Sequence, residues 1–340
     1  MGNQRQSLEQ LISLERLCKG DRRTLAKSIT LVESQLAAHQ ALAQTLLEKA
    51  LPYSGNSIRI GISGIPGVGK STFIEAFGLH LVAEGYKVAV LAVDPSSPIA
   101  GGSILGDKTR MEYLSREPNA YIRPSPAAGE LGGVAQKTRE SLLLCEAAGF
   151  DVILVETVGV GQSEYHVAGM VDFFLVLMQP NTGDELQGIK KGIVELADAL
   201  VINKADGELE PFAEQAKGHY QQALDLLKPN AASKSVGAEK TEVTAFWKSK
   251  VMTCSALMNR NIDTVWNMIQ DYCQQSKAER AFENKRTQQN IEWMESLFRQ
   301  AVLSSIAAKP GFNELKTQLK QDIGSGKITP LAAAKTLMNL

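Results

Sequence analysis

Residues 58–72 read Ile58-Arg-Ile-Gly-Ile-Ser-Gly64-Ile-Pro-Gly-Val-Gly69-Lys70-Ser71-Thr72. An apolar run leads into a glycine-rich loop and then into a helix-like segment, an order that is typical of a phosphate-binding loop. Gly64, Gly69, Lys70 and Ser71 match the pattern G-x-x-x-x-G-K-[ST] without a mismatch. The glycines let phosphate oxygens approach the backbone N–H groups, and the following helix adds its positive N-terminal end. The stretch therefore predicts a nucleotide-binding site.

The residues of this loop have separate expected roles. Lys70 would reach the β- and γ-phosphates, and the Ser71 hydroxyl would ligate Mg²⁺. A glycine turn that only joins a strand to a helix is the alternative, but the strand before the loop and the helix after it favour nucleotide binding. The residues expected to contact the nucleotide phosphates are Gly64, Ile65, Pro66, Gly67, Val68, Gly69, Lys70, Ser71 and Thr72.

Composition excludes several classes of protein. The 340 residues are 44% hydrophobic and 21% charged, and the net charge of −1 suggests neither nucleic acid nor an anionic membrane as a partner. No apolar run reaches the roughly 18 residues of a membrane helix, and the first residues do not resemble a signal peptide, so we expect a cytoplasmic protein. The scattered cysteines predict neither a disulfide framework nor a zinc site; they are Cys18, Cys145, Cys254 and Cys273.

Short β-rich runs alternate with helical segments through the middle of the chain. Most runs are continuously apolar, as in strands that are buried on both faces of a parallel sheet. We therefore expect an α/β fold with a doubly wound, mostly parallel sheet and a ligand at the carboxyl ends of its strands. The predicted strands are Ile58–Ser63, Val88–Val93, Ala120–Arg123, Asp151–Thr157, Phe173–Met178, Ala199–Asn203 and Val251–Cys254.

Helical patterns flank this central region. Residues 4–50 predict two helices, the second of them capped by Asp21 and continuing from Leu25 through Leu47. A helix is expected from Asn261 to Ser276, and residues 277–340 are helical again with a break at Lys309-Pro-Gly. Within this tail, periodicity leaves open whether one apolar stripe packs on another chain or on its own domain; the stripe consists of Trp293, Leu297, Phe298 and Val302.

A second motif follows the strand that ends near residue 203. In Asn203-Lys204-Ala-Asp206, the Asp206 carboxylate can accept hydrogen bonds from both N1–H and the 2-amino group of guanine, whereas adenine has neither donor there. Asn203 would tie the motif to the phosphate loop, and the stem of Lys204 would lie on the base. The alternative role for Asp206 is a helix N-cap before Glu208. A further base-contact loop is predicted at Ser255, Ala256 and Leu257.

Three acids at the ends of predicted strands are candidate magnesium ligands together with Ser71. They are Asp94, Asp107 and Glu156. Carboxylates suit Mg²⁺, and an acid at the end of a buried strand needs a partner. Glu156 begins an E-x-x-G stretch that ends at Gly159, where many GTPases have D-x-x-G. An N-cap or a loop salt bridge is the alternative for each acid.

Two stretches have the composition of nucleotide-sensitive switch segments, residues 95–106 and 160–164. Gln162 could orient the attacking water, although surface polarity explains this residue almost equally well. Lys108 and Arg110 could reach phosphate. The residues expected to carry catalysis are Lys70, Asp94, Glu156 and Gln162.

With these motifs assembled, the chain resembles the ArgK/MeaB family, the P-loop GTPases associated with methylmalonyl-CoA mutase, which belong to the SIMIBI class. One departure is Asn261, where related chains tend to have glycine; asparagine tolerates a left-handed backbone, so we expect the turn to persist. The resemblance rests on Gly64–Thr72, Val93-Asp-Pro-Ser-Ser-Pro98, Gly101-Gly-Ser-Ile-Leu-Gly-Asp-Lys-Thr-Arg-Met111, Leu131-Gly-Gly133, Glu156-Thr-Val-Gly-Val-Gly-Gln-Ser-Glu164 and Asn203-Lys-Ala-Asp206.

The resemblance implies a helical N-terminal extension over residues 1–50, a P-loop G domain over 51–276 and a helical dimerisation arm over 277–340. It implies a homodimer that binds GTP or GDP with Mg²⁺ and hydrolyses GTP slowly, since no arginine finger is evident. The implied client is the adenosylcobalamin-dependent methylmalonyl-CoA mutase, whose cofactor loading and protection would depend on nucleotide state. A third switch is implied at about Gln179–Lys191, where Lys190 and Lys191 could reach an acidic surface.

Two other functions share the phosphate loop. A metal-delivery GTPase of the nickel-insertion kind would need histidine-rich or paired cysteine ligands, and the four histidines and four cysteines are scattered. A P-loop kinase would not need a guanine-selecting motif, so Asn203–Asp206 counts against it. Both remain alternatives to the GTPase switch.

Overall fold

The computed structural model describes residues 13–93, 111–124, 131–157, 163–180, 191–227 and 247–340. Its centre is a seven-stranded parallel sheet with the strand order β3-β2-β4-β1-β5-β6-β7. The α/β prediction is confirmed, and each predicted strand is present with ends that differ by at most one residue. The strands are β1 (Ile58–Gly64), β2 (Val88–Val93), β3 (Ala120–Arg123), β4 (Val152–Thr157), β5 (Phe173–Met178), β6 (Ala199–Ile202) and β7 (Lys250–Thr253).

Strand β1 lies in the middle of the sheet, between β4 and β5. Ile62 is in register with Glu156 of β4, and Gly64 is in register with Leu177 of β5. Parallel strands end at the same edge, so the chain segments after β1, β4 and β5 leave the sheet side by side.

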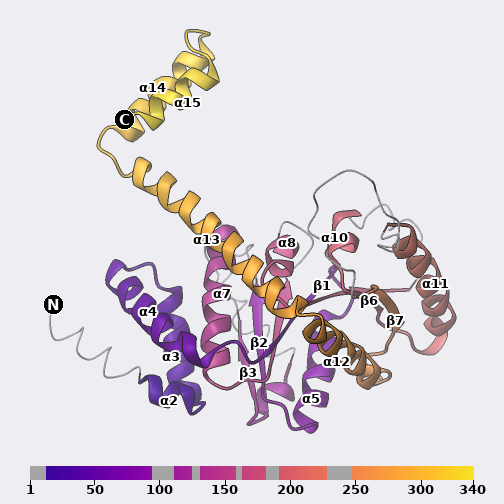
Figure 1. The fold of residues 1–340 in the computed structure, drawn as a ribbon. Helices are drawn as coiled ribbons and strands as arrows, with labels where there is room; N and C mark the ends of the chain where they lie inside the picture. Colours follow the sequence, from indigo (N-terminus) through magenta and orange to yellow (C-terminus); the bar gives the residue numbers. More distant parts are fainter. Residues whose placement is uncertain (1–12, 94–110, 125–130, 158–162, 181–190, 228–246) are drawn as a thin grey trace. The chain divides into compact units, whose positions relative to one another are not determined.

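Helices cover both faces of the sheet (Figure 1). Each face of the sheet has its own hydrophobic core. Successive strand residues alternate between these cores; on β4, for example, Leu154 belongs to one and Val155 to the other. The first core is covered by α2 (Leu14–Cys18), α3 (Arg22–Glu33), α4 (Ala37–Ala50), α7 (Leu131–Ala147), α8 (Ser163–Ala168), α10 (Lys191–Leu196) and α11 (Glu210–Leu227). The second is covered by α5 (Lys70–Ala83) and α12 (Ile262–Ala278). Short 3₁₀ turns are η1 (Leu51–Tyr53), η2 (Leu114–Arg116) and η3 (Gly207–Leu209).

The single long helix predicted from Asp21 to before Pro52 is wrong. The cap itself is confirmed, since the Asp21 carboxylate accepts a hydrogen bond from the Thr24 N–H at 2.7 Å. However, the helix ends at Glu33, and α4 begins only at Ala37. The Ser34 hydroxyl lies 2.8 Å from His39 Nδ1 and also accepts a bond from the Leu36 N–H. Such local side-chain bonds compete with the helical backbone and break the helix here.

The N-terminal helices share the first core with α7, which places them inside the fold of the sheet domain. Leu25 and Ile29 of α3 are completely buried in the same cluster as Leu144 and Cys145 of α7. Polar contacts join the layers as well, because the Arg22 guanidinium donates to the Glu117 carbonyl and Arg123 of β3 pairs with Glu33 of α3.

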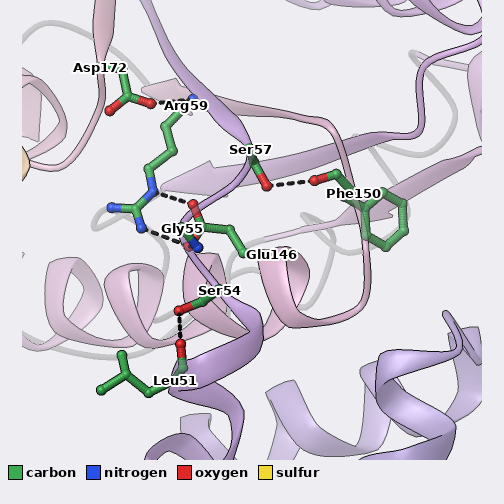
Figure 2. Close-up of polar contacts among 8 residues, drawn as sticks. All are labelled: Leu51, Ser54, Gly55, Ser57, Arg59, Glu146, Phe150 and Asp172. Carbon is green, nitrogen blue, oxygen red and sulfur yellow. Dashed lines mark hydrogen bonds and ion pairs between the residues drawn. The ribbon is translucent and has the colours of Figure 1, made fainter. Parts of the chain in front are cut away.

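Figure 2 shows polar contacts at the amino end of β1. The Glu146 carboxylate of α7 accepts two bonds of 2.8 Å from the Arg59 guanidinium and one of 2.9 Å from the Gly55 N–H. The Arg59 N–H donates to the Asp172 carboxylate at 2.7 Å. The Glu146 side chain is 0% exposed and that of Arg59 12%, so this is a buried and well-satisfied ion pair. It fixes the segment that connects η1 to the sheet.

Contacts along the chain divide it into two compact units, residues 1–282 and 283–340. Helix α12 confirms the predicted helix over residues 261–276, and α13 (Ala281–Ala307) begins at the end of the first unit. After Lys309-Pro-Gly come α14 (Phe312–Gly324) and α15 (Pro330–Met338), as predicted. None of the helices in the described part of the chain combines the length and the hydropathy needed to span a bilayer.

Candidate nucleotide-binding site

The phosphate loop joins the end of β1 to the start of α5, and its glycines are required for steric reasons. A Cβ on Gly64, whose φ is 149°, would lie 2.6 Å from the Leu177 carbonyl oxygen of β5. A Cβ on Gly69, whose φ is 93°, would lie 2.7 Å from Asn203 Nδ2. Both distances are shorter than real Cβ contacts, so a larger residue would displace the neighbouring strand or the second motif.

The Lys70 side chain folds back over this loop. Its Nζ donates to the Gly64 carbonyl at 2.6 Å and to the Ile65 carbonyl at 3.2 Å. Burial lowers the pKa of Lys70, and the nearby Glu156 and Glu164 carboxylates oppose that shift. The amine is thus held by two carbonyls of the loop that would bind a phosphate.

Glu156 lies beside the first turn of α5. The Ser71 hydroxyl donates to its carboxylate at 3.3 Å, and the Glu156 residue is only 5% exposed. A hydroxyl and a buried carboxylate are hard oxygen ligands of the kind that Mg²⁺ prefers, so this pair fits a magnesium site. Within the described residues, no group of three or more His, Cys, Asp or Glu side chains could hold a metal ion.

Several predicted site residues lie outside the described part of the chain. They are Asp94, Asp107, Lys108, Arg110, Gln162 and Lys190. Most of the two predicted switch segments and of the implied third switch lies there too. Of the predicted magnesium ligands, the described residues Ser71 and Glu156 lie together.

Asn203 connects the second motif to the phosphate loop. This buried side chain donates from Nδ2 to the Val68 carbonyl at 2.9 Å, and its Oδ1 accepts from the Ala256 N–H at 3.0 Å. Three segments from different parts of the sequence therefore meet at one amide: the phosphate loop, the segment after β6 and the segment after β7.

Lys204 follows with a left-handed backbone, φ 61°. Its Nζ donates to the Gly67 carbonyl at 2.7 Å and to Gln179 Oε1 at 3.3 Å. The ammonium thus reaches back to the phosphate loop, so the methylene stem stretches between the two motifs. Gln179 is the first residue after β5, and the sequence interpretation gave it no part in the base site.

Asp206 is held from the loop after β7. Its carboxylate accepts a hydrogen bond from the Ser255 hydroxyl, and the Met258 N–H donates to that hydroxyl at 3.1 Å. The alternative of an N-cap finds no support, because Asp206 precedes η3 but its side chain makes no capping bond. The Ala256 side chain is buried, whereas Leu257 is 77% exposed.

A tight hairpin presents this loop. Ser255 and Arg260 exchange two backbone hydrogen bonds, and the Arg260 guanidinium pairs with Glu210 of α11 at 2.9 Å. Asn261 has φ 59°, and its side chain donates to the Thr253 carbonyl at 3.1 Å. The expectation that asparagine preserves the turn is therefore confirmed.

A further acid near the loop was missed as an individual residue. Glu164 of α8 is 0% exposed, and its charge acts on Lys70. The sequence could have indicated Glu164, because this residue follows a glycine-rich stretch after a strand. Residues in such a position lie at the ligand-binding edge of a parallel sheet.

Comparison with known proteins identifies the family. A sequence profile described as "Methylmalonyl Co-A mutase-associated GTPase MeaB" matches residues 25–311. The chain belongs to the MeaB family. It is accordingly a GTPase that binds GTP and GDP through a P-loop domain.

Relatives of this MeaB-family chain span nearly all of it. GTPase ArgK of Escherichia coli is 46% identical over 325 residues, which cover 96% of this chain and 94% of ArgK. The mouse "Methylmalonic aciduria type A homolog, mitochondrial" is 44% identical over 332 residues, which cover 95% of this chain and 77% of the mouse protein.

A solved structure also resembles the MeaB-family chain along its whole length. It is the crystal structure of a protein called "LAO/AO transport system kinase", with a TM-score of 0.74 and 40% identity, and the match covers 98% of this chain and 97% of the other. The word kinase belongs to the name of that protein, whereas the family profile and ArgK are described as GTPases. The guanine-type motif at Asn203–Asp206 agrees with the GTPase description.

Proposed function

We propose that this GTPase is a nucleotide-dependent chaperone of the adenosylcobalamin-dependent methylmalonyl-CoA mutase, acting in cofactor loading and in protection of the mutase. The family description names that mutase, and a relative is named after methylmalonic aciduria. The observation that carries the switch part of the proposal is the Asn203 amide, which bonds the phosphate loop and the base loop together. One nucleotide would thus engage both loops at once.

In the proposed site, Lys70 binds the β- and γ-phosphates, and backbone N–H groups of residues 64–72 other than Pro66 surround them. Ser71 and Glu156, with Asp94 and Asp107, would hold Mg²⁺, which supplies positive charge beside the phosphates when it is bound. Gln162 would orient the attacking water. This assignment is supported by the 3.3 Å contact between Ser71 and Glu156 and by the position of Lys70 over the loop.

Guanine would be selected by Asp206, which accepts hydrogen bonds from N1–H and from the 2-amino group. Ser255 donates to Asp206 and so fixes the orientation of its carboxylate. Lys204 would lie along one face of the base. Leu257, in the loop after β7, is exposed. An adenine nucleotide would give the Asp206 carboxylate no donors from the base, which is costly at a half-buried site.

The proposal divides the chain into a helical extension (1–50), the G domain (51–276) and a dimerisation arm (277–340). On α13, exposed apolar side chains support an intermolecular role for the arm. They are Ile291, Met294, Phe298, Val302 and Leu303. We expect a low intrinsic rate of GTP hydrolysis that rises when the client completes the site.

The test is a binding assay with purified methylmalonyl-CoA mutase in the presence of a GTP analogue, GDP or no nucleotide. Hydrolysis rates are measured with and without the mutase. Binding that depends on nucleotide, together with faster hydrolysis, would support the chaperone role. Normal hydrolysis without binding in any state would leave the GTPase in place and remove the client.

A further inference from the structure

The ammonium group of Lys204 is held by two neutral oxygens from two different segments. One is the Gly67 carbonyl of the phosphate loop at 2.7 Å, and the other is Gln179 Oε1 at 3.3 Å. Gln179 lies directly after β5, the strand between β1, which carries the phosphate loop, and β6, which carries the Asn203–Asp206 motif. Its position between the two nucleotide-binding loops follows from the strand order.

A lysine side chain has four rotatable bonds, and ordering it on a ligand carries an entropic cost. The left-handed backbone at Lys204 and the bond between the Asn203 N–H and the Met178 carbonyl fix where this side chain starts. The acceptors at Gly67 and Gln179 fix where it ends. With both ends fixed, the methylene stem is preorganised before any base arrives, and preorganisation raises affinity by lowering the cost of ordering.

We infer that Gln179 is a positioning residue for guanine-nucleotide binding, which acts by holding the Lys204 side chain stretched along the face of the base. The inference rests on the nucleotide-binding part of the proposed function and does not depend on the client. It gives Gln179 a role that neither of the two sequence motifs contains. It also makes the end of β5 part of the base site, through Lys204.

The test is a double-mutant cycle with GDP as the titrated ligand, measured by calorimetry. Gln179→Leu removes the acceptor and keeps the size of the side chain, and it should weaken GDP binding about three- to tenfold. Gln179→Glu keeps an acceptor and should bind GDP within about twofold of the wild type. In a Lys204→Met background, which lacks the ammonium, Gln179→Leu should have no further effect.

A matched control is Gln221→Leu. Gln221 is also half-buried, and its Oε1 accepts from the Val251 N–H at 3.1 Å, between α11 and β7. This variant should bind GDP like the wild type even if both glutamine variants lower the melting temperature.

The inference is overturned if Gln179→Leu binds GDP like the wild type, or if its effect is equally large in the Lys204→Met background. Failure of the client proposal looks different, since the wild type would then bind GDP normally but never the mutase.

Discussion

Single side chains hold the nucleotide site together, because its loops come from distant parts of the sequence. Asn203 is the plainest case: it is 2% exposed and bonds Val68 on one side and Ala256 on the other. Its Nδ2 also occupies the space that a Cβ on Gly69 would need. The phosphate loop and the base motif therefore constrain each other at this position.

Replacement of this residue tests the constraint. Asn203→Ala leaves a buried carbonyl and a buried N–H without their partner, and each such group costs about 1–3 kcal/mol. We expect the free energy of unfolding, measured in urea, to fall by about 2–4 kcal/mol and GDP binding to weaken by at least about tenfold. Asn290→Ala, at an exposed position of α13, should change neither quantity; an unchanged stability of Asn203→Ala would contradict the bridging role.

We expect Lys70 to favour nucleotide binding but to destabilise the nucleotide-free fold. Its pKa is lowered by burial, so the folded state releases the proton of Lys70 more readily than the unfolded state, whose lysine titrates near 10.5. At a pH below the pKa of Lys70 in the folded state, the buried charged amine lowers the free energy of unfolding of the nucleotide-free protein. This loss of stability shrinks as pH rises from the folded-state pKa towards 10.5, the pKa in the unfolded state.

Lys70→Met should therefore raise the stability of the nucleotide-free protein at neutral pH, and the gain should shrink as pH rises towards 10.5. GTP binding should weaken by about ten- to 150-fold, because a charged hydrogen-bond donor to phosphate is lost. Urea unfolding at several pH values and calorimetry provide the two measurements. A loss of stability at neutral pH would show that contacts of the amine with the loop outweigh its burial.

At the scale of elements, the buried pair between Arg59 and Glu146 connects β1, α7 and the segment after η1. Glu146→Ala would leave the Arg59 guanidinium buried without its partner, and we expect a loss of about 3–5 kcal/mol in urea unfolding. Removing both charges, with Arg59→Met added, should recover part of this loss.

The control for this prediction is an exposed ion pair of the same chemistry. Glu295→Gln, which breaks the pair with Arg299 on α13, should change stability by no more than about 0.5 kcal/mol. Equal effects of Glu146→Ala and Glu295→Gln would mean that burial adds nothing to the Arg59 pair.

The sequence predicted the strands well and one helix boundary badly. Strands such as β2 and β5 are buried along their whole length, so their composition alone distinguishes them. The break between α3 and α4 depends on side-chain bonds of Ser34, and serine is also common inside helices. Apolar residues keep their helical spacing across this break, so the sequence pattern does not reveal where α3 ends.

For the candidate site, local spacing predicted the phosphate loop and the Asn203 motif. Spacing cannot reveal a partner such as Gln179, which lies 25 positions before Lys204 in the sequence and meets it only through the strand order. The buried pair of Arg59 and Glu146 escaped for the same reason. Contacts of this kind follow from topology, and a motif does not encode topology.

At the scale of the whole molecule, the proposed dimerisation arm predicts a change in oligomeric state. Phe298 on α13 is 65% exposed, and a charge there would disrupt an apolar interface. Phe298→Glu should shift the protein from dimer to monomer in analytical ultracentrifugation while GTP hydrolysis without client is retained.

Gln300→Glu is the control for the arm, since it adds the same charge at an exposed position about 200° around the helix. It should remain dimeric. A wild type that sediments as a monomer at every concentration, with or without nucleotide, would remove the proposed role of the arm.

The shared core of α3 and α7 has a consequence for the order in which the protein is made. Helix α3 leaves the ribosome well before its partner, because α7 begins at Leu131 and α3 ends at Glu33. At roughly 5–20 residues per second, the apolar face of α3 would wait on the order of 5–20 seconds for α7. During synthesis that face, with Leu25 and Ile29, is a natural site for ribosome-bound chaperones. The N-terminal helices of the sheet domain cannot complete their packing before α7 has been made.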